Sequence, residues 1–593
     1  MTRIPLRPLA RILEARANGE NPDAIEKENT RARHEDMRDR DRARAEGRLL
    51  VLGVVFFCAY AVIGVRMGMM ASSEPYEPRA RASSAHIVTQ RADITDRHGR
   101  ILATNLETHS LYAHPQQMIE PKRVATELAR IFPDLDRERM IKDFSGKRKF
   151  VWIKKKISPE QKQAVHDIGD PGLLFGPREM RLYPNGRLAA HVLGGASFGK
   201  EGVDAAEVIG VAGIEKVYDT YLRDPAEGGK PLQLSLDLTV QAAAEQVLYG
   251  GMKLMNAKGA AAVLMDVHTG EVISVVSLPD FDPNDRPRPP TEGAPDDSPL
   301  FNRAVQGVYE LGSTFKIFAA AQAMELGLVN PSTVIDIRGP LKWGKHRIRD
   351  FHNYGKELSV SKIIEKSSNI GTARLAMMIG GSRQREFLGK LGMLDAVPVE
   401  IVEASGSTPL LPSNWSEIST MTISYGHGIS VSPMHLAAAY AAVANGGTQV
   451  RPTLLKQDGP QYGQRVMSQQ VSAASRDMLR RVVTEGTASF GEVEGYAVAG
   501  KTGTADKPKP RGGYYKDKVI ATFASMFPAD DPKYVLILTL DEPETYALGE
   551  TRRTAGWTAV PVAAEMINRV APLLGLRPQV EPGKLAGITL TSN

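Results

Sequence analysis

The sequence predicts an α+β chain of several domains that follows a single apolar, membrane-spanning helix near the N-terminus. Three observations predict this class. The chain has 593 residues, enough for about four domains. Its composition, 42% hydrophobic and 24% charged, is ordinary for proteins with packed cores. Its apolar residues switch along the chain between the two-residue period of strands and the longer period of helices.

Charge and cysteine content exclude several functions. Lys and Arg number 74 against 68 Asp and Glu, and residues 1–48 hold 12 and 10 of these, so the other 545 residues carry only +4. Such a small excess does not make a basic surface, so no nucleic-acid partner is expected. The chain has one cysteine, Cys58, so it can form neither an intrachain disulfide nor a cysteine-based zinc site. Cys58 lies in the most apolar stretch of the chain.

The first element in order is the apolar segment 49–71, predicted to be an uncleaved membrane-spanning helix. Leu49–Val65 carries no charge, and Arg66 can extend to the membrane interface. A buried core helix would not be apolar on every face, and a cleaved signal peptide fits poorly after a polar segment of 48 residues. Residues 31–48 contain seven arginines and residues 66–83 three, which predicts a cytoplasmic N-terminus and an exported remainder.

The flanks and the rest of the chain follow. Residues 1–48 are predicted to be a charged tail, solvated or loosely helical, and residues 72–85 a linker. Short strands and helices mix over 86–232. The later predicted elements are a strand beginning near Leu232-Gln233-Leu234-Ser235-Leu236, a helix Thr239–Met255, a hairpin of Gly259–Asp266 and Glu271–Ser277, a Pro-rich loop Asp282–Leu300, a buried helix from Ser313, a strand Val535–Leu540, an amphipathic helix Val560–Leu574 and a loose tail after Leu576.

Ser313-Thr314-Phe315-Lys316 places a serine and a lysine one turn apart at the start of an apolar helix. The structural interpretation is a helix N-cap, but a capping box has Glu where this chain has Lys316, whose charge opposes the helix dipole. The dipole field and burial would lower the lysine pKa and leave a neutral amine able to take the Ser313 proton. The same spacing at Ser197–Lys200 and Ser359–Lys362 shows that this motif alone is weak evidence.

Lys501-Thr502-Gly503-Thr504 has two interpretations. Gly495–Thr502 matches the phosphate-binding pattern G-x-x-x-x-G-K-T, which requires a helix directly after its Lys-Thr. The chain continues instead with glycines and prolines through Gly513, which no helix accommodates. Ala497-Val498-Ala499 indicates a strand leading into the motif, and an exported location argues against ATP chemistry.

Ser367-Ser368-Asn369 falls between two helical stretches, Ser361–Lys366 and Thr372–Ile379, and alone would be read as a polar helix junction. Other hydrolase designs are poorly supported. No His-Glu-x-x-His and no convincing metal cluster occurs among the 12 histidines, and no Gly-x-Ser-x-Gly is present. No metal and no cofactor are therefore expected.

The three motifs in this order resemble the catalytic set of the penicillin-binding proteins. The likeness extends over roughly residues 48–575 to the class B group, and within it to the division-specific peptidoglycan transpeptidases. Further segments carry it: Arg91-Ala92-Asp93-Ile94-Thr95-Asp96-Arg97-His98-Gly99-Arg100, with Ala92 in place of the usual Gly; Arg181–Gly186 with His191 and Gly194; Gly210–Glu215 with Tyr218 and Leu222; Asn302–Val305 and Glu310-Leu311-Gly312, with Leu311 in place of the usual Pro; and Ser424–Gly428 with Ser432-Pro433.

The resemblance implies a domain order. After the tail 1–48 and the transmembrane helix 49–71, a linker and non-catalytic pedestal domain would occupy 72–232. A transpeptidase domain, with a central antiparallel sheet flanked by helices, would occupy 233–576, followed by a C-terminal tail 577–593. Arg91 and Glu215 are expected to serve pedestal structure rather than chemistry.

It also implies a role for each motif residue. Ser313 would be the nucleophile that attacks the D-Ala-D-Ala carbonyl of a donor stem, and Lys316 its base. Ser367 and Asn369 would position the stem, Ser367 also relaying a proton to the departing D-Ala. The remaining roles fall on the third motif: Lys501 would support this network electrostatically, Thr502 and Thr504 with Gly503 between them would bind the terminal carboxylate, and backbone N–H groups of Ser313 and Thr504 would form the oxyanion hole.

Partners follow from the same resemblance. They are peptidoglycan stem peptides (a D-Ala-D-Ala donor and a diamino-acid acceptor), β-lactam antibiotics, an FtsW-type glycosyltransferase and the membrane proteins of the division complex. The expected location is the inner membrane at the septum, with the catalytic domain periplasmic. The alternatives are an elongation-specific class B transpeptidase, a membrane-tethered β-lactamase, which would need no pedestal, and a β-lactam sensor, for which one helix and a short tail leave little signalling machinery.

Overall fold

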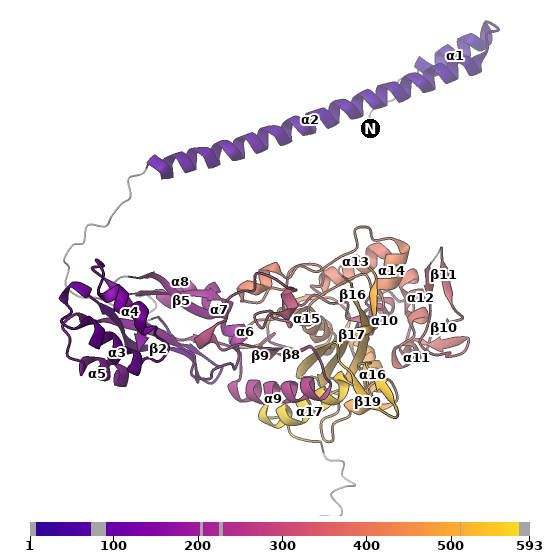
Figure 1. Ribbon diagram of the computed structural model, residues 1–593. Helices are drawn as coiled ribbons and strands as arrows, with labels where there is room; N and C mark the ends of the chain where they lie inside the picture. Colours follow the sequence, from indigo (N-terminus) through magenta and orange to yellow (C-terminus); the bar gives the residue numbers. More distant parts are fainter. Residues whose placement is uncertain are drawn as a thin grey trace, which may run out of the picture. The chain divides into compact units, whose positions relative to one another are not determined.

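The computed structural model describes residues 7–72, 91–201, 206–224, 229–344, 346–509 and 512–579. The chain divides into two compact units, Met1–Ile87 and Val88–Asn593, whose elements are labelled in Figure 1. The first unit holds α1 (Arg7–Ala17) and the long α2 (Pro22–Ser72). Within α2, Glu46–Met67 is long and apolar enough to cross a membrane and is not buried against any part of the chain. This segment overlaps the predicted span 49–71.

The charged tail is more ordered than the loose helix that the sequence analysis allowed, because α2 begins well before the apolar stretch. Residues 22–48 are rich in Ala, Arg and Glu, which favour helices. Ion pairs one turn apart, Arg31–Glu35 at 3.5 Å and Arg42–Glu46 at 3.1 Å, add support on the surface. The predicted linker, from residue 73 onward, and the C-terminal tail, from residue 580 onward, lie outside the described residues.

The second unit begins with a lobe, here called the first lobe, that is built on the long strand β2 (Ile101–Ala113). Strand β2 pairs antiparallel with β1, β3 and β4, and β1 pairs parallel with β7. Three helices cover one small core of this lobe, and a hairpin and three short helices complete it. The elements are β1 (Ile94–Thr95), β3 (Val151–Ile157), β4 (Leu173–Leu182), β5 (Gly195–Glu201), β6 (Ala206–Ala212), β7 (Leu232–Gln233), α3 (Pro121–Ile131), α4 (Arg137–Phe144), α5 (Pro159–His166), α6 (Ala190–Leu193), α7 (Gly213–Val217) and α8 (Asp219–Arg223).

The second lobe contains a five-stranded antiparallel sheet in the order β16-β17-β18-β8-β9, as expected of a central antiparallel sheet. Its strands are β8 (Gly259–Asp266), β9 (Val272–Leu278), β16 (Ala499–Pro508), β17 (Tyr514–Phe527) and β18 (Tyr534–Asp541). Strands β8 and β9 are buried along nearly their whole length, because helices cover both faces of the sheet. The predicted hairpin around Gly270 and the predicted strand at Val535–Leu540 are confirmed.

Helices α9 and α17 pack against each other on one face of this sheet (Figure 1). Helix α15 contacts β8, β17 and β18, and α16 contacts β16. The predicted helices at 239–255 and 560–574 correspond to α9 and α17. The bounds are α9 (Leu238–Leu254), α10 (Lys316–Glu325), α11 (Val360–Lys366), α12 (Asn369–Ile379), α13 (Gly381–Lys390), α14 (Glu417–Ile423), α15 (Pro433–Ala444), α16 (Gln469–Thr484) and α17 (Ala559–Leu573).

Small two-stranded sheets decorate this lobe. They are β10 (Val334–Asp336) with β13 (Glu357–Ser359), β11 (Leu341–Trp343) with β12 (His346–Ile348), β14 (Thr448–Val450) with β15 (Tyr462–Arg465), and β19 (Thr545–Ala547) with β20 (Glu550–Arg552). The strand expected near Leu232–Leu236 is only the two-residue β7, since Leu234 forms an isolated bridge to Leu455 instead. The loop expected at Asp282–Leu300 contains two short 3-10 turns and no longer element.

Three sequence segments of the first lobe converge on one buried carboxylate, that of Glu215. Arg91 donates to one Glu215 oxygen from Nε and Nη2 at 2.8 and 2.6 Å, and Arg181 Nε donates to the other at 2.6 Å. Asp219 takes a further N–H of Arg91 at 2.8 Å. These residues are far apart in sequence, so the network holds together the start of the lobe, β4 and α7. It matches the structural role expected of Arg91 and Glu215.

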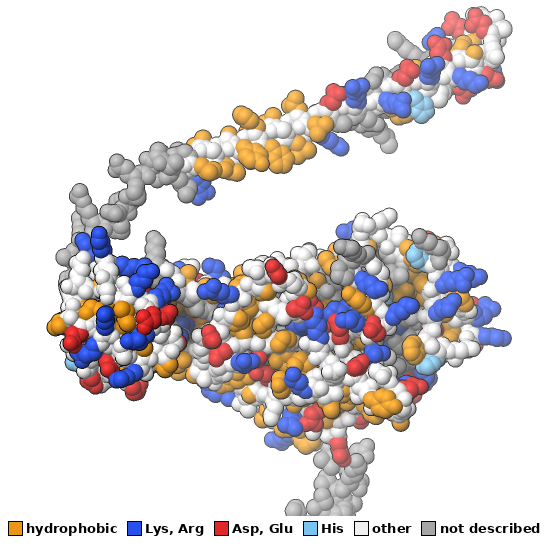
Figure 2. Space-filling model, viewed as in Figure 1, with side chains coloured by type: hydrophobic (Ala, Val, Ile, Leu, Met, Phe, Trp, Pro, Cys, Tyr) orange, Lys and Arg blue, Asp and Glu red, His pale blue; other side chains and the backbone are white. Residues whose placement is uncertain are grey.

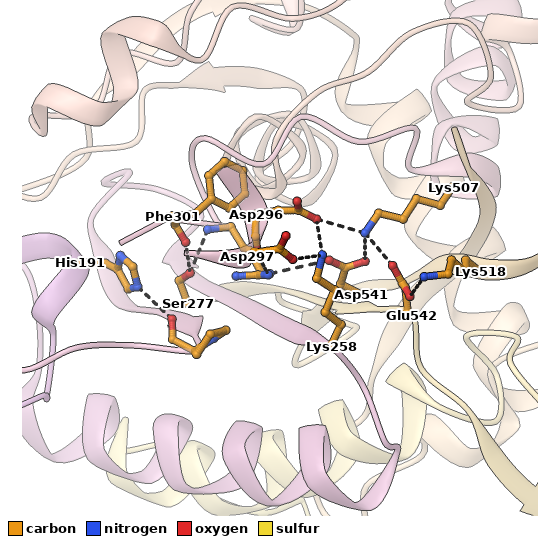
Figure 3. Close-up of polar contacts among 12 residues, drawn as sticks. His191, Lys258, Ser277, Asp296, Asp297, Phe301, Lys507, Lys518, Asp541 and Glu542 are labelled. Carbon is orange, nitrogen blue, oxygen red and sulfur yellow. Dashed lines mark hydrogen bonds and ion pairs between the residues drawn. The ribbon is translucent and has the colours of Figure 1, made fainter. Parts of the chain in front are cut away.

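A second charged network lies within the second lobe, and Figure 3 shows its side chains converging from β16, the end of β18 and the 282–300 loop. Lys507, near the end of β16, donates to Asp541 at 2.9 Å, to Glu542 at 3.0 Å and to Asp296 of the 282–300 loop at 3.2 Å.

The two lobes contact each other directly. His191 of α6, in the first lobe, contacts the Pro279 carbonyl of the second lobe at 3.4 Å, and burial lowers the His191 pKa to about 4. One hydrophobic cluster also runs from the first lobe into the second. The lobes are therefore fixed to each other by both apolar and polar contacts.

Candidate active site

Ser313 lies in a 3-10 turn, Gly312–Phe315, directly before α10. The Lys316 N–H donates to the Ser313 carbonyl, and side chains three residues apart in a 3-10 turn eclipse each other. Ser313 and Lys316 therefore lie on one face. The caps of the turn and of α10 are Leu311 and Phe315, so Ser313 caps neither helix. The N-cap interpretation of this serine is wrong.

The Ser313 turn packs directly against β16, and glycines make the contact close enough. A Cβ on Gly503 would lie 2.2 Å from the Leu311 carbonyl oxygen. A Cβ on Gly312, where φ is +56°, would lie 2.9 Å from the Thr504 carbonyl oxygen. Gly426, from the Ser424–Gly428 segment, approaches the same turn, since its Cβ would lie 2.1 Å from the Gly312 oxygen. The turn that carries Ser313 and the strand that carries Lys501–Thr504 are thus in direct backbone contact.

Two lysines are buried where this turn and this strand meet. Lys316 is 1% exposed and Lys501, in β16, is fully buried. Burial and the neighbouring Lys501 charge hold the Lys316 pKa well below its ordinary value, while Asp350 acts in the opposite direction. Burial lowers the Lys501 pKa to about 7. Two like charges in a desolvated site disfavour protonation of both amines at once, which favours a neutral amine in this pair.

The hydroxyl of Ser367 joins the two lysines. It accepts from Lys316 Nζ at 3.0 Å and from Lys501 Nζ at 3.0 Å. Lys316 also donates to the Ser367 carbonyl at 2.5 Å. A serine oxygen has two acceptor sites, so both are filled while its own proton stays available, since no acceptor for that proton occurs among the described residues. Ser367 ends α11 in the left-handed region, with φ of +62°, which turns its side chain toward the lysines.

The second and third residues of this motif begin α12. The Ser368 hydroxyl accepts from Gly371 N–H as an N-cap and donates to Asp350 at 2.7 Å. The other Asp350 oxygen accepts from Ile370 N–H at 3.0 Å. Asn369 is half-buried and donates to the Arg349 carbonyl at 2.9 Å. Asp350 is thus a supporting residue that the sequence analysis missed, and an isolated Asp in a loop offered no signal for it.

The threonines of the Lys-Thr-Gly strand have fixed partners. The hydroxyls of Thr502 and Thr487 lie 2.7 Å apart, and the Thr504 hydroxyl accepts from Ala555 N–H at 3.0 Å. An oxygen that accepts one bond keeps its proton free to donate. Thr502 is nearly buried and Thr504 half-buried, so both stand at the edge of the site rather than in open solvent. Thr487 was also missed from the sequence.

The predicted site residues therefore meet in one place. Ser313 with Lys316, Ser367, and the strand Lys501–Thr504 form a contiguous cluster, and Asn369 lies at its rim. The phosphate-binding interpretation of Gly495–Thr502 is wrong, because Lys501 and Thr502 lie within a strand and no helix follows them. A hydroxyl nucleophile beside a neutral amine, with a second hydroxyl shared between two amines, is suited to acyl transfer.

Comparison with known proteins agrees with this geometry. Residues 260–567 match the family described as penicillin binding protein transpeptidase domain, and residues 86–231 match the penicillin-binding protein dimerisation domain. A protein of Caulobacter vibrioides named probable peptidoglycan D,D-transpeptidase FtsI is 34% identical over 93% of both chains.

Two more distant relatives cover nearly as much. Peptidoglycan D,D-transpeptidase FtsI of Escherichia coli is 27% identical over 83% of this chain and 85% of its own, and stage V sporulation protein D of Bacillus subtilis is 28% identical over 90% and 86%. The crystal structure of penicillin binding protein 3 from Mycobacterium tuberculosis, complexed with aztreonam, superposes with a TM-score of 0.62 at 25% identity. It covers 83% of this chain and 97% of that one.

Proposed function

This chain belongs to the class B penicillin-binding proteins and is a peptidoglycan D,D-transpeptidase, and we propose that Ser313 is the nucleophile of its reaction. The observation that carries this assignment is the Ser367 hydroxyl, which accepts from two buried lysines beside the Ser313 turn. The Lys316 amine donates two hydrogen bonds to Ser367, one to its backbone carbonyl and one to its hydroxyl. A neutral amine then keeps its lone pair for the Ser313 proton.

In the first half-reaction, Ser313 Oγ bonds to the carbonyl carbon of the penultimate D-Ala of a donor stem. Lys316 Nζ takes the Ser313 proton as this bond forms. Backbone N–H groups of Ser313 and Thr504 are proposed to hold the resulting oxyanion, where loss of one donor costs about 10²–10³ in rate. Thr502 and Thr504, across Gly503, are proposed to bind the terminal carboxylate through their hydroxyl protons, with Thr487 donating to Thr502 and Ala555 N–H to Thr504 when the carboxylate is bound.

The C–N bond to the terminal D-Ala breaks next, and the departing nitrogen requires a proton. Ser367 can supply it, because its oxygen already accepts from both lysines and its own proton is uncommitted among the described contacts. Lys316, now protonated, replaces the Ser367 proton through their contact. Lys501 steadies this exchange electrostatically, and Asn369 positions the stem. The amine of a diamino acid on a second stem then attacks the Ser313 ester, which joins the stems and returns the proton to Ser313.

Family membership does not specify which wall-synthesis pathway the chain serves, and we propose one here. We assign the chain to septal wall synthesis, because two relatives that it matches over most of its length carry the name FtsI. A sporulation protein matches nearly as well, so an elongation or other class B role is the alternative. The candidate span Glu46–Met67 fits a single-pass inner-membrane anchor, and the arginines before it favour a cytoplasmic N-terminus and a periplasmic catalytic lobe.

Partners are also proposed from the family and from the motifs of this chain. Glycan strands must be supplied by another protein, because the motifs found here perform only peptide cross-linking, so an FtsW-type glycosyltransferase and other division proteins are expected. β-Lactams are expected to acylate Ser313, in keeping with a related solved structure that holds aztreonam. A tethered β-lactamase and a β-lactam sensor would also be acylated, and the fate of the adduct separates them.

Labelled penicillin on the full-length chain in detergent tests this assignment. The expected result is a stable adduct in the wild type, none in Ser313→Ala, and cross-linked product from polymerised substrate. Ser197→Ala is the matched control, because Ser197 has the same Ser-x-x-Lys spacing but lies in β5. Rapid turnover of the adduct would indicate a β-lactamase, a stable adduct without cross-linking would indicate a sensor, and an adduct in Ser313→Ala would remove Ser313 as nucleophile.

A further inference from the structure

A polar cavity of about 400 Å³ lies beside the candidate active site, and the transfer chemistry above does not use it. The β10–β13 segment forms most of its wall, including Arg338, Arg349, His352 and Tyr354, and Ile370 of α12 completes it. This last residue directly follows the Ser367-Ser368-Asn369 motif in sequence. The cavity therefore adjoins the rim of the site rather than a remote surface.

Direct contacts tie this cavity to the motif. Asn369 Nδ2 donates to the Arg349 carbonyl at 2.9 Å. Asp350, next to Arg349 in the chain, accepts from the Ser368 hydroxyl at 2.7 Å and from Ile370 N–H at 3.0 Å. The cavity wall and the motif thus form one hydrogen-bonded structure. A ligand in the cavity would lie beside a donor stem positioned by Asn369.

The cavity segment carries an unusual share of the positive charge. Residues 334–359 contain six Lys and Arg against three Asp and Glu, a net charge of +3 in a chain whose total is +6. Figure 2 shows lysine and arginine side chains gathered at this end of the second lobe. One acid, Asp336, is held by Arg338 at 2.7 Å. Another, Asp350, is committed to α12.

This arrangement leaves cations facing solvent without matching acids. Arg349, which lines the cavity, is exposed and has no ion-pair partner among the described residues; the exposed Arg347 lies nearby in sequence but outside the cavity wall. Arginine presents a planar fork that matches a carboxylate with two hydrogen bonds. A cavity of this size with exposed arginines fits a small group of carboxylates better than an apolar ligand, since the wall is mainly polar.

We propose that this cavity binds the carboxylates of the acceptor stem peptide. The proposal rests on the proposed function, which requires a second stem beside the acylated serine. A stem peptide ends in a free carboxylate and carries more where its glutamate and diamino acid are not amidated. Its reacting amine must reach the Ser313 ester, so its carboxylates need a cationic anchor near the rim. The Arg349 side chain is a positioning group for the second half-reaction.

The binding of synthetic stem tripeptides to the full-length chain in detergent, with Ser313 first acylated by penicillin, tests the proposal. Two probes are compared: the tripeptide with free carboxylates and the same tripeptide with all carboxylates amidated. We expect the free acid to bind about tenfold more tightly at low salt, and the preference to shrink as salt rises. Arg349→Ala should remove most of this preference, whereas Arg349→Lys should keep part of it.

Arg451→Ala is the matched control, because Arg451 is an exposed arginine near the β8–β9 turn. It should leave the preference unchanged, and thermal melts check that each variant is folded. If Arg349→Ala does not fold, Arg338→Gln takes its place. Equal affinities for the two tripeptides, or equal losses in Arg349→Ala and Arg451→Ala, would overturn the proposal.

Two further outcomes are informative. If Arg349→Ala weakens binding to phosphatidylglycerol vesicles while the tripeptide preference persists, the basic segment contacts lipid and the acceptor proposal is wrong. If penicillin does not acylate the wild-type chain at all, the failure lies with the proposed function, because the cavity takes no part in forming the adduct.

Discussion

Buried cations occur in both lobes of the second unit, but their neighbours differ. In the first lobe, Arg91 and Arg181 surround Glu215, and their side chains are 2% exposed or less. In the second lobe, Lys316 and Lys501 are equally buried, yet among the described residues neither forms an ion pair. Their shared partner is instead the neutral hydroxyl of Ser367.

The difference shows how side-chain type separates structure from chemistry. An arginine does not lose its proton in a protein, so Arg91 and Arg181 stay charged when buried, and the Glu215 carboxylate offsets that charge. A lysine can be buried without one if it gives up its proton, and it then becomes a base. The first lobe therefore uses buried charge to hold three segments together, and we propose that the second uses burial to prepare a reactive amine.

The largest expected effect comes from removing Lys316, the proposed base. Lys316→Ala should slow penicillin acylation by about 10²–10⁴-fold, the usual contribution of a general base. Its melting temperature should not fall as it would for a paired buried charge, because no buried carboxylate loses its partner. Stopped-flow acylation and thermal melts measure both, with exposed Lys390→Ala as the control. Wild-type acylation by Lys316→Ala would break the comparison.

Removing the carboxylate of the first lobe should have the opposite pattern. Glu215→Gln leaves the buried Arg181 without its carboxylate and Arg91 with Asp219 alone, which costs about 3–5 kcal/mol of stability. Acylation by the folded fraction should be unchanged. Glu127→Gln, which removes only an exposed pair with Arg130, should cost at most about 1 kcal/mol. A Glu215→Gln protein with wild-type stability would show that the network does not hold the lobe.

The smallest effect concerns pH. The rate of acylation should fall by about tenfold per pH unit below the lowered Lys316 pKa. Lys501→Met removes the neighbouring charge that lowers this pKa, so the acid limb of its profile should move to higher pH, whatever its maximal rate. Acylation rates across the pH range measure this, and an unmoved limb would contradict the coupling of the two lysines.

Stability should follow the same lysine with a defined sign. The Lys501 pKa is 10.5 ordinarily and about 7 in the folded chain, so the unfolded chain binds more protons between these values. The free energy of unfolding therefore rises with pH across that window. Thermal melts of Lys501→Met should lack this rise, and its advantage over wild type should shrink as pH increases.

Much of the site could be predicted from the sequence, because its chemistry follows local spacing. Ser313 and Lys316 are one turn apart, and the glycines and prolines after Lys501 exclude a helix. Asp350 and Thr487 could not be predicted, since each reaches its partner across a loop whose path no local pattern encodes. The charged tail is predicted to be solvated or loosely helical, and its mixed charges do not locate the start of α2 at Pro22, although the residues that follow favour helices.

The left-handed backbone of Ser367 has a consequence beyond the reaction. Such a conformation costs a residue with a side chain about 1–3 kcal/mol, and glycine would adopt it freely. Glycine has no hydroxyl, however, so the change that would relax the backbone at this position would also remove the oxygen that both buried lysines contact. A gain in stability and the proposed proton relay are therefore incompatible at this one residue.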